Sequence, residues 1–127
     1  MKIKSSSELV ENALKEIKTI SPNEALELSN SNKCNLIDIR DSSELENTGR
    51  VLNSHHIPRG ILEFSINPES FFFKKEKLDL KKEIVLFCAA GGRSALAAKT
   101  LKDMGFEKVS HVEGGFSLMI NSGFKTI

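Results

Sequence analysis

The spacing of apolar residues along the chain predicts several amphipathic helices. Over residues 5–18 apolar positions recur every three or four residues, and Ser5 with Glu8 forms a capping-box pattern at the start. A second helix is predicted over residues 21–30, with Ser21 as N-cap and Pro22 at the first helical position. The clearest helix covers residues 93–105, which are rich in Ala and Leu and end in a glycine. Shorter helices are predicted in "DSSELEN", where Asp41 and Glu44 again stand in capping-box register, and in "NPESFFFKKEKLDL" and "GGFSLMINSGF".

Runs of apolar and β-branched residues between these helices predict strands. They are "KTI", "CNLIDIR", "IVLF" and "KVSHV", and the looser stretch "TGRVLNSHHIPRGILEF" is expected to hold one more short strand. Strands that alternate with helices favour a parallel sheet covered on both faces, which is an α/β sandwich.

Composition narrows the classes of function that remain. The 127 residues suffice for one domain, and a net charge of +1 gives no electrostatic case for a nucleic-acid partner. The N-terminus lacks the apolar run of a signal peptide, and the longest apolar run, residues 84–90, is too short to cross a membrane. We therefore expect a cytoplasmic protein with no membrane partner, in which Cys34 and Cys88 stay reduced. The three histidines show no zinc-ligand spacing, and His56 is expected to be structural.

The stretch "IVLFCAAGGRS" is the strongest candidate for chemistry. Cys88 follows a predicted strand at its carboxyl end, where parallel sheets bind ligands, and a helix follows the loop. Free N–H groups at a helix start favour an anion, and glycines allow a loop to turn its N–H groups inward. This position should lower the thiol pKa, Arg93 should add a positive charge, and Ser94 should cap the helix. An isolated cysteine after such a strand is otherwise most often a small buried hydrophobe.

Four ordered motifs support a functional interpretation. They are "LIDIRDSSELE", "HHIPRGI", "CAAGGRSALAAKTLKDMGF" and "VSHVEGGFSLMINSGF". Together, over about residues 20–124, they resemble a single-domain rhodanese, a sulfurtransferase homology domain. The resemblance implies a three-layer α/β sandwich with a central, mainly parallel sheet flanked by helices. A helical extension over residues 1–18 would precede a domain over residues 19–127.

The resemblance implies sulfur transfer through a persulfide on Cys88. The donor would be thiosulfate or a persulfide on a protein or small molecule, and the acceptor a thiol or cyanide. The loop that would bind the substrate and the persulfide consists of Ala89, Ala90, Gly91, Gly92, Arg93 and Ser94. Asp38 and Arg40 would support the site, and neither a metal nor an organic cofactor is expected.

Departures from the family pattern leave alternatives open. Ala89 and Ala90 stand where the family often has Arg and Ser, which puts thiosulfate in question as donor. A binding or regulatory module with little turnover is therefore one alternative. A phosphatase or arsenate-reductase-like enzyme is another, although the loop is one residue shorter than the phosphatase pattern and Phe87 replaces its histidine. Cys34 is expected to be inert, and residues 71–73 are expected in the core rather than over the site.

Overall fold

A five-stranded sheet forms the centre of this computed structural model, which describes residues 2–127. The strands lie in the order β1-β5-β4-β2-β3, and each neighbouring pair is parallel. Their bounds are Lys18–Ile20 for β1, Cys34–Asp38 for β2, His55–His56 for β3, Glu83–Phe87 for β4 and Val109–Val112 for β5. The predicted α/β fold is confirmed, with an all-parallel sheet rather than a mainly parallel one.

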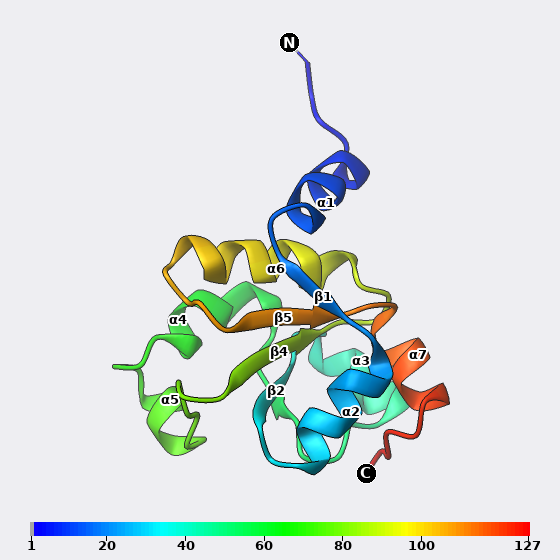
Figure 1. Ribbon diagram of the computed structural model, residues 1–127, viewed down its shortest axis with the longest axis vertical. Helices are drawn as coiled ribbons and strands as arrows, with labels where there is room; N and C mark the ends of the chain where they lie inside the picture. The colour runs from blue at the N-terminus through cyan, green and yellow to red at the C-terminus, as the bar shows by residue number, and fades with distance from the viewer. Residues whose placement is uncertain (1) are drawn as a thin grey trace.

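Helices cover both faces of the sheet (Figure 1). The helices are α1 (Ser6–Leu14), α2 (Pro22–Asn30), α3 (Ser42–Thr48), the 3-10 helix η1 (Arg59–Ile61), α4 (Leu62–Ile66), α5 (Phe71–Lys75), α6 (Gly92–Asp103) and α7 (Gly115–Asn121). Residues of α4 and α6 pack on one face, while residues of α2 and α7 pack on the other. The N-terminal helix α1 lies against α6, outside these layers.

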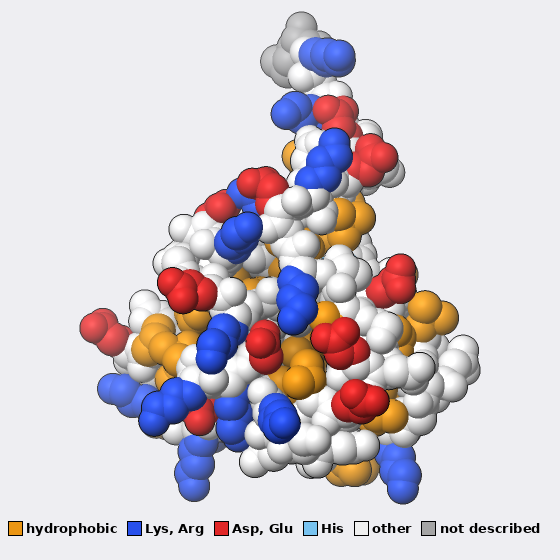
Figure 2. Space-filling model, viewed as in Figure 1, with side chains coloured by type: hydrophobic (Ala, Val, Ile, Leu, Met, Phe, Trp, Pro, Cys, Tyr) orange, Lys and Arg blue, Asp and Glu red, His pale blue; other side chains and the backbone are white. Residues whose placement is uncertain are grey.

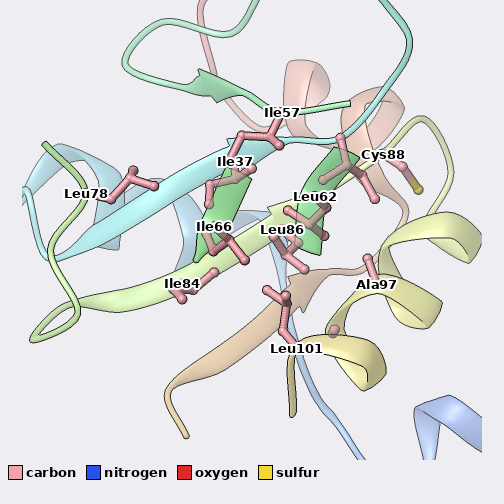
Figure 3. Packing of buried hydrophobic residues seen from close by; sticks show 12 residues of the cluster. Ile37, Ile57, Leu62, Ile66, Leu78, Ile84, Leu86, Cys88, Ala97 and Leu101 are labelled. Atoms are coloured by element: carbon pink, nitrogen blue, oxygen red, sulfur yellow. The ribbon is translucent and has the colours of Figure 1, made fainter. Parts of the chain in front are cut away.

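The central strand β4 shows why both faces are apolar. Ile84 and Leu86 point into the cluster beneath α4 and α6, whereas Val85 and Phe87 point into the cluster beneath α2 and α7. A strand buried on both sides reads as a continuous apolar run, as "IVLF" does. Cys88 lies at one end of the first cluster, where β4 leaves the sheet (Figure 3).

The caps of three helices lie where the sequence predicted them. The hydroxyl of Ser5 accepts a hydrogen bond from the N–H of Glu8, and that of Ser21 accepts one from Glu24, each at 3.1 Å. Asp41 and Glu44 form a complete capping box on α3. These side chains satisfy N–H groups that a helix leaves unpaired at its first turn.

Two local predictions need correction. Helix α6 begins at Gly92 rather than Arg93, its N-cap is Gly91, and Ser94 lies inside the first turn. Ser94 therefore does not cap the helix, and its hydroxyl is available for contacts inside the fold. The short helix α4 lies in a stretch for which only a strand had been predicted.

The two thiols lie at opposite ends of the neighbouring strands β2 and β4. Cys34 opens β2 beside Glu83, whereas Cys88 follows Phe87, which pairs with Asp38 at the other end of the same two strands. Five residues of strand separate them by roughly 17 Å at about 3.3 Å per residue, far beyond disulfide reach. Both cysteines are free, as predicted.

Surface charge follows the near-zero net charge of the chain. Positive and negative side chains are interspersed over the face that Figure 2 shows, including α1. Within residues 2–127, no helix has the length and apolar character needed to span a membrane. The division into an extension over residues 1–18 and a domain over residues 19–127 stays a prediction.

Candidate active site

Hydrogen-bond donors of the loop surround the sulfur of Cys88. The Sγ atom accepts hydrogen bonds from the N–H groups of Gly91 at 3.1 Å and Ser94 at 3.4 Å. The hydroxyl oxygen of Ser94 lies 3.5 Å from the same sulfur. Cys88 is 1% exposed, so these contacts replace the water that a surface thiol would have.

These contacts determine the direction of the thiol's pKa. Burial of Cys88 raises the pKa, but the hydroxyl and N–H of Ser94 and the N–H groups of Gly91 and Ala90 together lower it below its usual value. The change has the direction that the sequence predicted. The donors responsible all belong to the loop, so the thiolate is favoured by the Ser94 hydroxyl together with the backbone N–H groups of the loop.

Two glycines allow this loop to form. Gly91 has a φ of 108°, which side-chain-bearing residues rarely adopt, and this conformation turns its N–H toward the sulfur. Gly115 has a φ of 58°, and a Cβ there would collide with the carbonyl of Cys88 and lie 2.9 Å from that of Ala89. Its absence lets the N–H of Phe116 donate to the Cys88 carbonyl at 2.8 Å. The start of α7 therefore fixes the position of the loop through this hydrogen bond.

Replacing Gly115 with alanine should disturb this support. The strained φ and the collision should lower the free energy of unfolding by about 1–3 kcal/mol and slow alkylation of Cys88, because the loop must shift. Urea unfolding and thiol alkylation rates would measure both effects. The matched control is Gly60→Ala, since a Cβ at Gly60 meets nothing within 4 Å. Equal behaviour of the two variants would contradict the role given to Gly115.

Arg93 is placed at the site, but its charge is already paired. Its guanidinium donates to both carboxylate oxygens of Glu44, at 2.9 and 2.8 Å. This hydrogen bonding lowers the pKa of Glu44 to about 2 and raises the pKa of Arg93, so both groups are charged at ordinary pH. The expected free positive charge is therefore largely neutralised. The sequence indicated Glu44 only as a helix-capping residue, and no signal in it showed this second contact.

Asp38 and Arg40 form a buried ion pair after β2. The Arg40 Nη2 and Asp38 Oδ2 atoms are 2.8 Å apart, and both side chains are almost fully excluded from solvent. Arg40 also donates to the hydroxyl of Thr48 at 2.8 Å, and its guanidinium stacks 4.0 Å from the centre of the Phe116 ring. The pair thus contacts α3, which carries Glu44, and α7, which holds the loop. A supporting role through these helices fits this geometry better than direct contact with the sulfur.

A polar chain behind Ser94 had not been predicted. The Ser94 hydroxyl lies 2.9 Å from Nδ1 of His111, whose Nε2 lies 3.0 Å from the hydroxyl of Thr19. His111 is 2% exposed, and burial lowers its pKa, which favours the neutral ring. A histidine within the strand "KVSHV" was the available signal, but its neighbours depend on the order of the strands.

The remaining candidates lie away from the sulfur or have structural contacts. Burial raises the pKa of Cys34 to about 11, which fits the predicted inert thiol. His56 lies 2.7 Å from the carbonyl of Arg40, a structural contact. Phe72 and Phe73 pack against the core as expected, whereas Phe71 is 79% exposed. Within residues 2–127, no cluster of three or more His, Cys, Asp or Glu side chains could hold a metal ion.

A hollow of about 460 Å³ opens beside the loop. Helix α1 contributes Val10 and Leu14 to it, and the loop contributes Ala90, Gly91 and Gly92. Thr19 and His111 line the same space. Solvent or a small substrate can therefore reach the outer side of the loop between α1 and α6.

Comparison with known proteins assigns the fold and the family. The rhodanese-like domain family matches residues 21–121. The chain is 29% identical over 100 residues to the thiosulfate sulfurtransferase GlpE of Shewanella oneidensis, covering 79% of this chain and 89% of that one. It spans only 21%, 27% and 38% of the length of three other curated relatives that it matches.

Two solved structures are similar over nearly the whole chain. A protein of unknown function from Rhodopseudomonas palustris, described as a possible tyrosine phosphatase, has a TM-score of 0.85 at 34% identity, covering 100% of this chain and 97% of that one. The polysulfide-sulfur transferase homodimer of Wolinella succinogenes has a TM-score of 0.72 at 34% identity, covering 93% and 83%. With the family match over residues 21–121 and the cysteine loop at the carboxyl end of β4, the chain belongs to the rhodanese-like family.

Proposed function

We propose that this protein transfers sulfane sulfur through a persulfide on Cys88. The Cys88 thiolate attacks the outer sulfur of a donor, the donor's S–S bond breaks, and the remainder leaves with the electron pair as sulfite or a thiolate. An acceptor thiolate or cyanide then attacks the terminal sulfur of the persulfide. The bond between the two sulfurs breaks, and the Cys88 thiolate is regenerated.

The observation that carries this proposal is the ring of donors around a buried sulfur. A thiolate is the nucleophile in such chemistry, and the N–H groups of Gly91 and Ser94 favour the thiolate without a metal. The loop from Ala89 to Ser94 can offer the same kind of donor to the terminal sulfur of a persulfide, which is also an anion. Relatives named for sulfur transfer from thiosulfate and from polysulfide support this assignment.

Mass spectrometry after incubation with a sulfane donor tests the proposal. Wild-type protein should gain about 32 Da, one sulfur atom, as a persulfide. Cys88→Ser should gain nothing. Cys34→Ser should gain the same mass as wild type, because Cys34 lies at the end of the strands opposite to Cys88. Equal labelling of wild type and Cys88→Ser would sink the proposal.

Two alternatives have distinct outcomes in parallel assays. Ala89 and Ala90 leave the loop without the charge of a strong anion site, which suits a binding module with little turnover. That alternative predicts no persulfide with any donor class and a protein partner whose binding survives Cys88→Ala. A phosphatase is suggested by the description of the Rhodopseudomonas palustris protein. It predicts p-nitrophenyl phosphate hydrolysis that disappears in Cys88→Ser.

A further inference from the structure

We infer that Ser94, His111 and Thr19 form a hydrogen-bond chain that carries the proton of the Cys88 thiol to solvent. The same chain then points the hydroxyl proton of Ser94 at the thiolate. His111 and Thr19 would act as positioning residues, because they reach the sulfur only through Ser94. The inference rests on the proposed function in one respect, namely that Cys88 is the reacting thiol. It adds to the site Thr19, which lies outside the four sequence motifs, and His111, which lies within one of them but outside the Cys88 loop.

The pairing of β1 with β5 places the residues of this hydrogen-bond chain next to one another. Thr19 of β1 pairs with His111 of β5, and both side chains lie on the face that α6 covers. The successive separations are 3.5 Å from Cys88 Sγ to Ser94 Oγ, 2.9 Å from Ser94 Oγ to His111 Nδ1 and 3.0 Å from His111 Nε2 to Thr19 Oγ1. The two contacts between oxygen and nitrogen have ordinary hydrogen-bond distances, and the longer contact between sulfur and oxygen is also a hydrogen bond. The path is therefore continuous from β4 to the edge strand of the sheet.

The burial of Cys88 explains why its thiol would lose a proton through such a path. Cys88 is 1% exposed and His111 is 2% exposed, so the thiol has little access to water that could take its proton. Thr19 is exposed and lines the hollow beside Gly91 and Gly92. The hydrogen-bond chain therefore connects the buried thiol of Cys88 to the exposed side chain of Thr19 in the hollow.

The proton step balances along the chain. In the thiol form, Cys88 S–H donates to Ser94 Oγ, Ser94 O–H donates to His111 Nδ1, and His111 Nε2–H donates to Thr19 Oγ1. Each proton then moves to its acceptor, and the hydroxyl proton of Thr19 passes to a water molecule in the hollow. Four bonds to hydrogen break and four form, which leaves a thiolate, a neutral histidine and two intact hydroxyls.

The reversed chain also orients the Ser94 hydroxyl. His111 now donates from Nδ1 to Ser94, which leaves the hydroxyl proton of Ser94 free to point at the sulfur. Without that donor, the carbonyl of Gly91, 3.2 Å from Ser94 Oγ, competes for the same proton. The relay requires a neutral ring, and burial lowers the pKa of His111 accordingly. Among the described residues that line the hollow, Glu113 is the single charged group.

Thr19 offers the cleanest test, because Thr19→Val removes one hydroxyl from an exposed position without changing the shape. In a Cys34→Ser background, the pH dependence of iodoacetamide alkylation reports the pKa of Cys88. Thr19→Val should raise that pKa by about half to one unit, because the chain that points the Ser94 hydroxyl proton at the thiolate loses its last hydrogen bond. Alkylation should then slow about three- to tenfold at pH values below both pKa values. Thr19→Ser should restore the wild-type profile because it retains the hydroxyl.

His111→Phe should produce a shift at least as large, since it also removes the donor to Ser94. The matched control is His55→Gln, because His55 lies on β3 at the opposite edge of the sheet and pairs with Glu76. If His111→Phe does not fold, the Thr19→Val and Thr19→Ser pair decides alone. A Cys88 profile unchanged in Thr19→Val overturns the inference, as does one raised equally in Thr19→Val and Thr19→Ser.

Alkylation separates this inference from the proposed function, because it measures the thiol and not sulfur transfer. Persulfide formation with an unchanged pKa in Thr19→Val would reject the relay and keep the sulfurtransferase. A shifted pKa in a protein that takes up no sulfur from any donor would keep the relay and reject the sulfurtransferase.

Discussion

Replacing Asp38 with alanine is expected to lower the free energy of unfolding by about 3–5 kcal/mol, because the charge of Arg40 would remain buried without its partner. The wild-type pair is 0% and 2% exposed at its two side chains, and three hydrogen bonds join the Arg40 guanidinium to the carboxylate. Asp38 also accepts from the backbone N–H of Arg40 at 2.9 Å. Urea unfolding followed by circular dichroism would measure the loss.

The effect of Asp38→Ala should be compared with that of a surface ion pair of the same type. Arg59 of η1 and Glu63 of α4, four positions apart in sequence, form such a pair at 2.8 Å, with both side chains about one third exposed. Glu63→Ala should change the free energy of unfolding by only about 0.5 kcal/mol, because solvent screens an exposed pair. Similar losses in Asp38→Ala and Glu63→Ala would mean that the buried pair does not hold the fold.

A double variant separates charge from packing. Asp38→Leu with Arg40→Met removes both charges and retains apolar volume, so it should recover much of the stability that Asp38→Ala loses. The Cys88 loop should still be disturbed in that variant. Arg40 also contacts Thr48 and Phe116, which belong to the two helices that carry Glu44 and support the loop. The double variant should therefore retain much of its stability while its Cys88 loop is displaced.

Features that depend on neighbours in sequence were predicted well. Ser5, Ser21 and the Asp41–Glu44 capping box lie where their spacing predicted, because a helix cap joins residues only three positions apart. The position of Cys88 at a strand end before a helix follows from the same local reasoning. The N-terminal boundary of α6 was misplaced because glycines favour a loop, yet Gly92 adopts the helix.

Features that depend on strand order could not be predicted. His111 meets Thr19 only because β5 lies beside β1, although 92 positions separate the two residues in sequence. Arg93 meets Glu44 only because α3 and α6 approach the same edge of the sheet. The sequence therefore indicated the nucleophile and its loop, while the residues that tune the thiol and neutralise the charge required the fold.

Thiosulfate is expected to be a poor donor for the wild-type protein, with a KM in the millimolar range or above. Arg93 is the one charged residue from Cys88 to Ser94, and the Glu44 carboxylate accepts hydrogen bonds from both of its terminal nitrogens, Nη1 and Nη2. A dianion must displace this carboxylate or be held without a cation. The pKa of Glu44 is lowered to about 2, so the carboxylate stays ionised and mild acidification to pH 5 should not free Arg93.

Glu44→Gln and Ala89→Arg should each improve thiosulfate turnover. Ala89→Arg adds a cation within the loop, and a charge-assisted hydrogen bond contributes about 1.5–3 kcal/mol, so kcat/KM should rise about ten- to hundredfold. Glu44→Gln should give a smaller gain, about three- to tenfold, because the Arg93–Glu44 pair is partly exposed and already screened by solvent. Arg93→Ala should abolish most of the turnover. Sulfite release from thiosulfate, measured over a range of concentrations, gives these constants.

The controls distinguish local charge from a general change. Glu46→Gln removes a negative charge from an exposed position on the same helix α3 and should leave kcat/KM for thiosulfate unchanged. An uncharged alkyl hydropersulfide, whose outer sulfur Cys88 attacks with release of an alkyl thiolate, should be used almost equally well by wild type, Glu44→Gln and Ala89→Arg, because no dianion has to be held. A micromolar KM for thiosulfate in the wild type, unmoved by either substitution, would show that cations outside the loop bind the donor. Gains with both donors alike would instead point to a change in the reactivity of Cys88, since only donor binding depends on the charge of the donor.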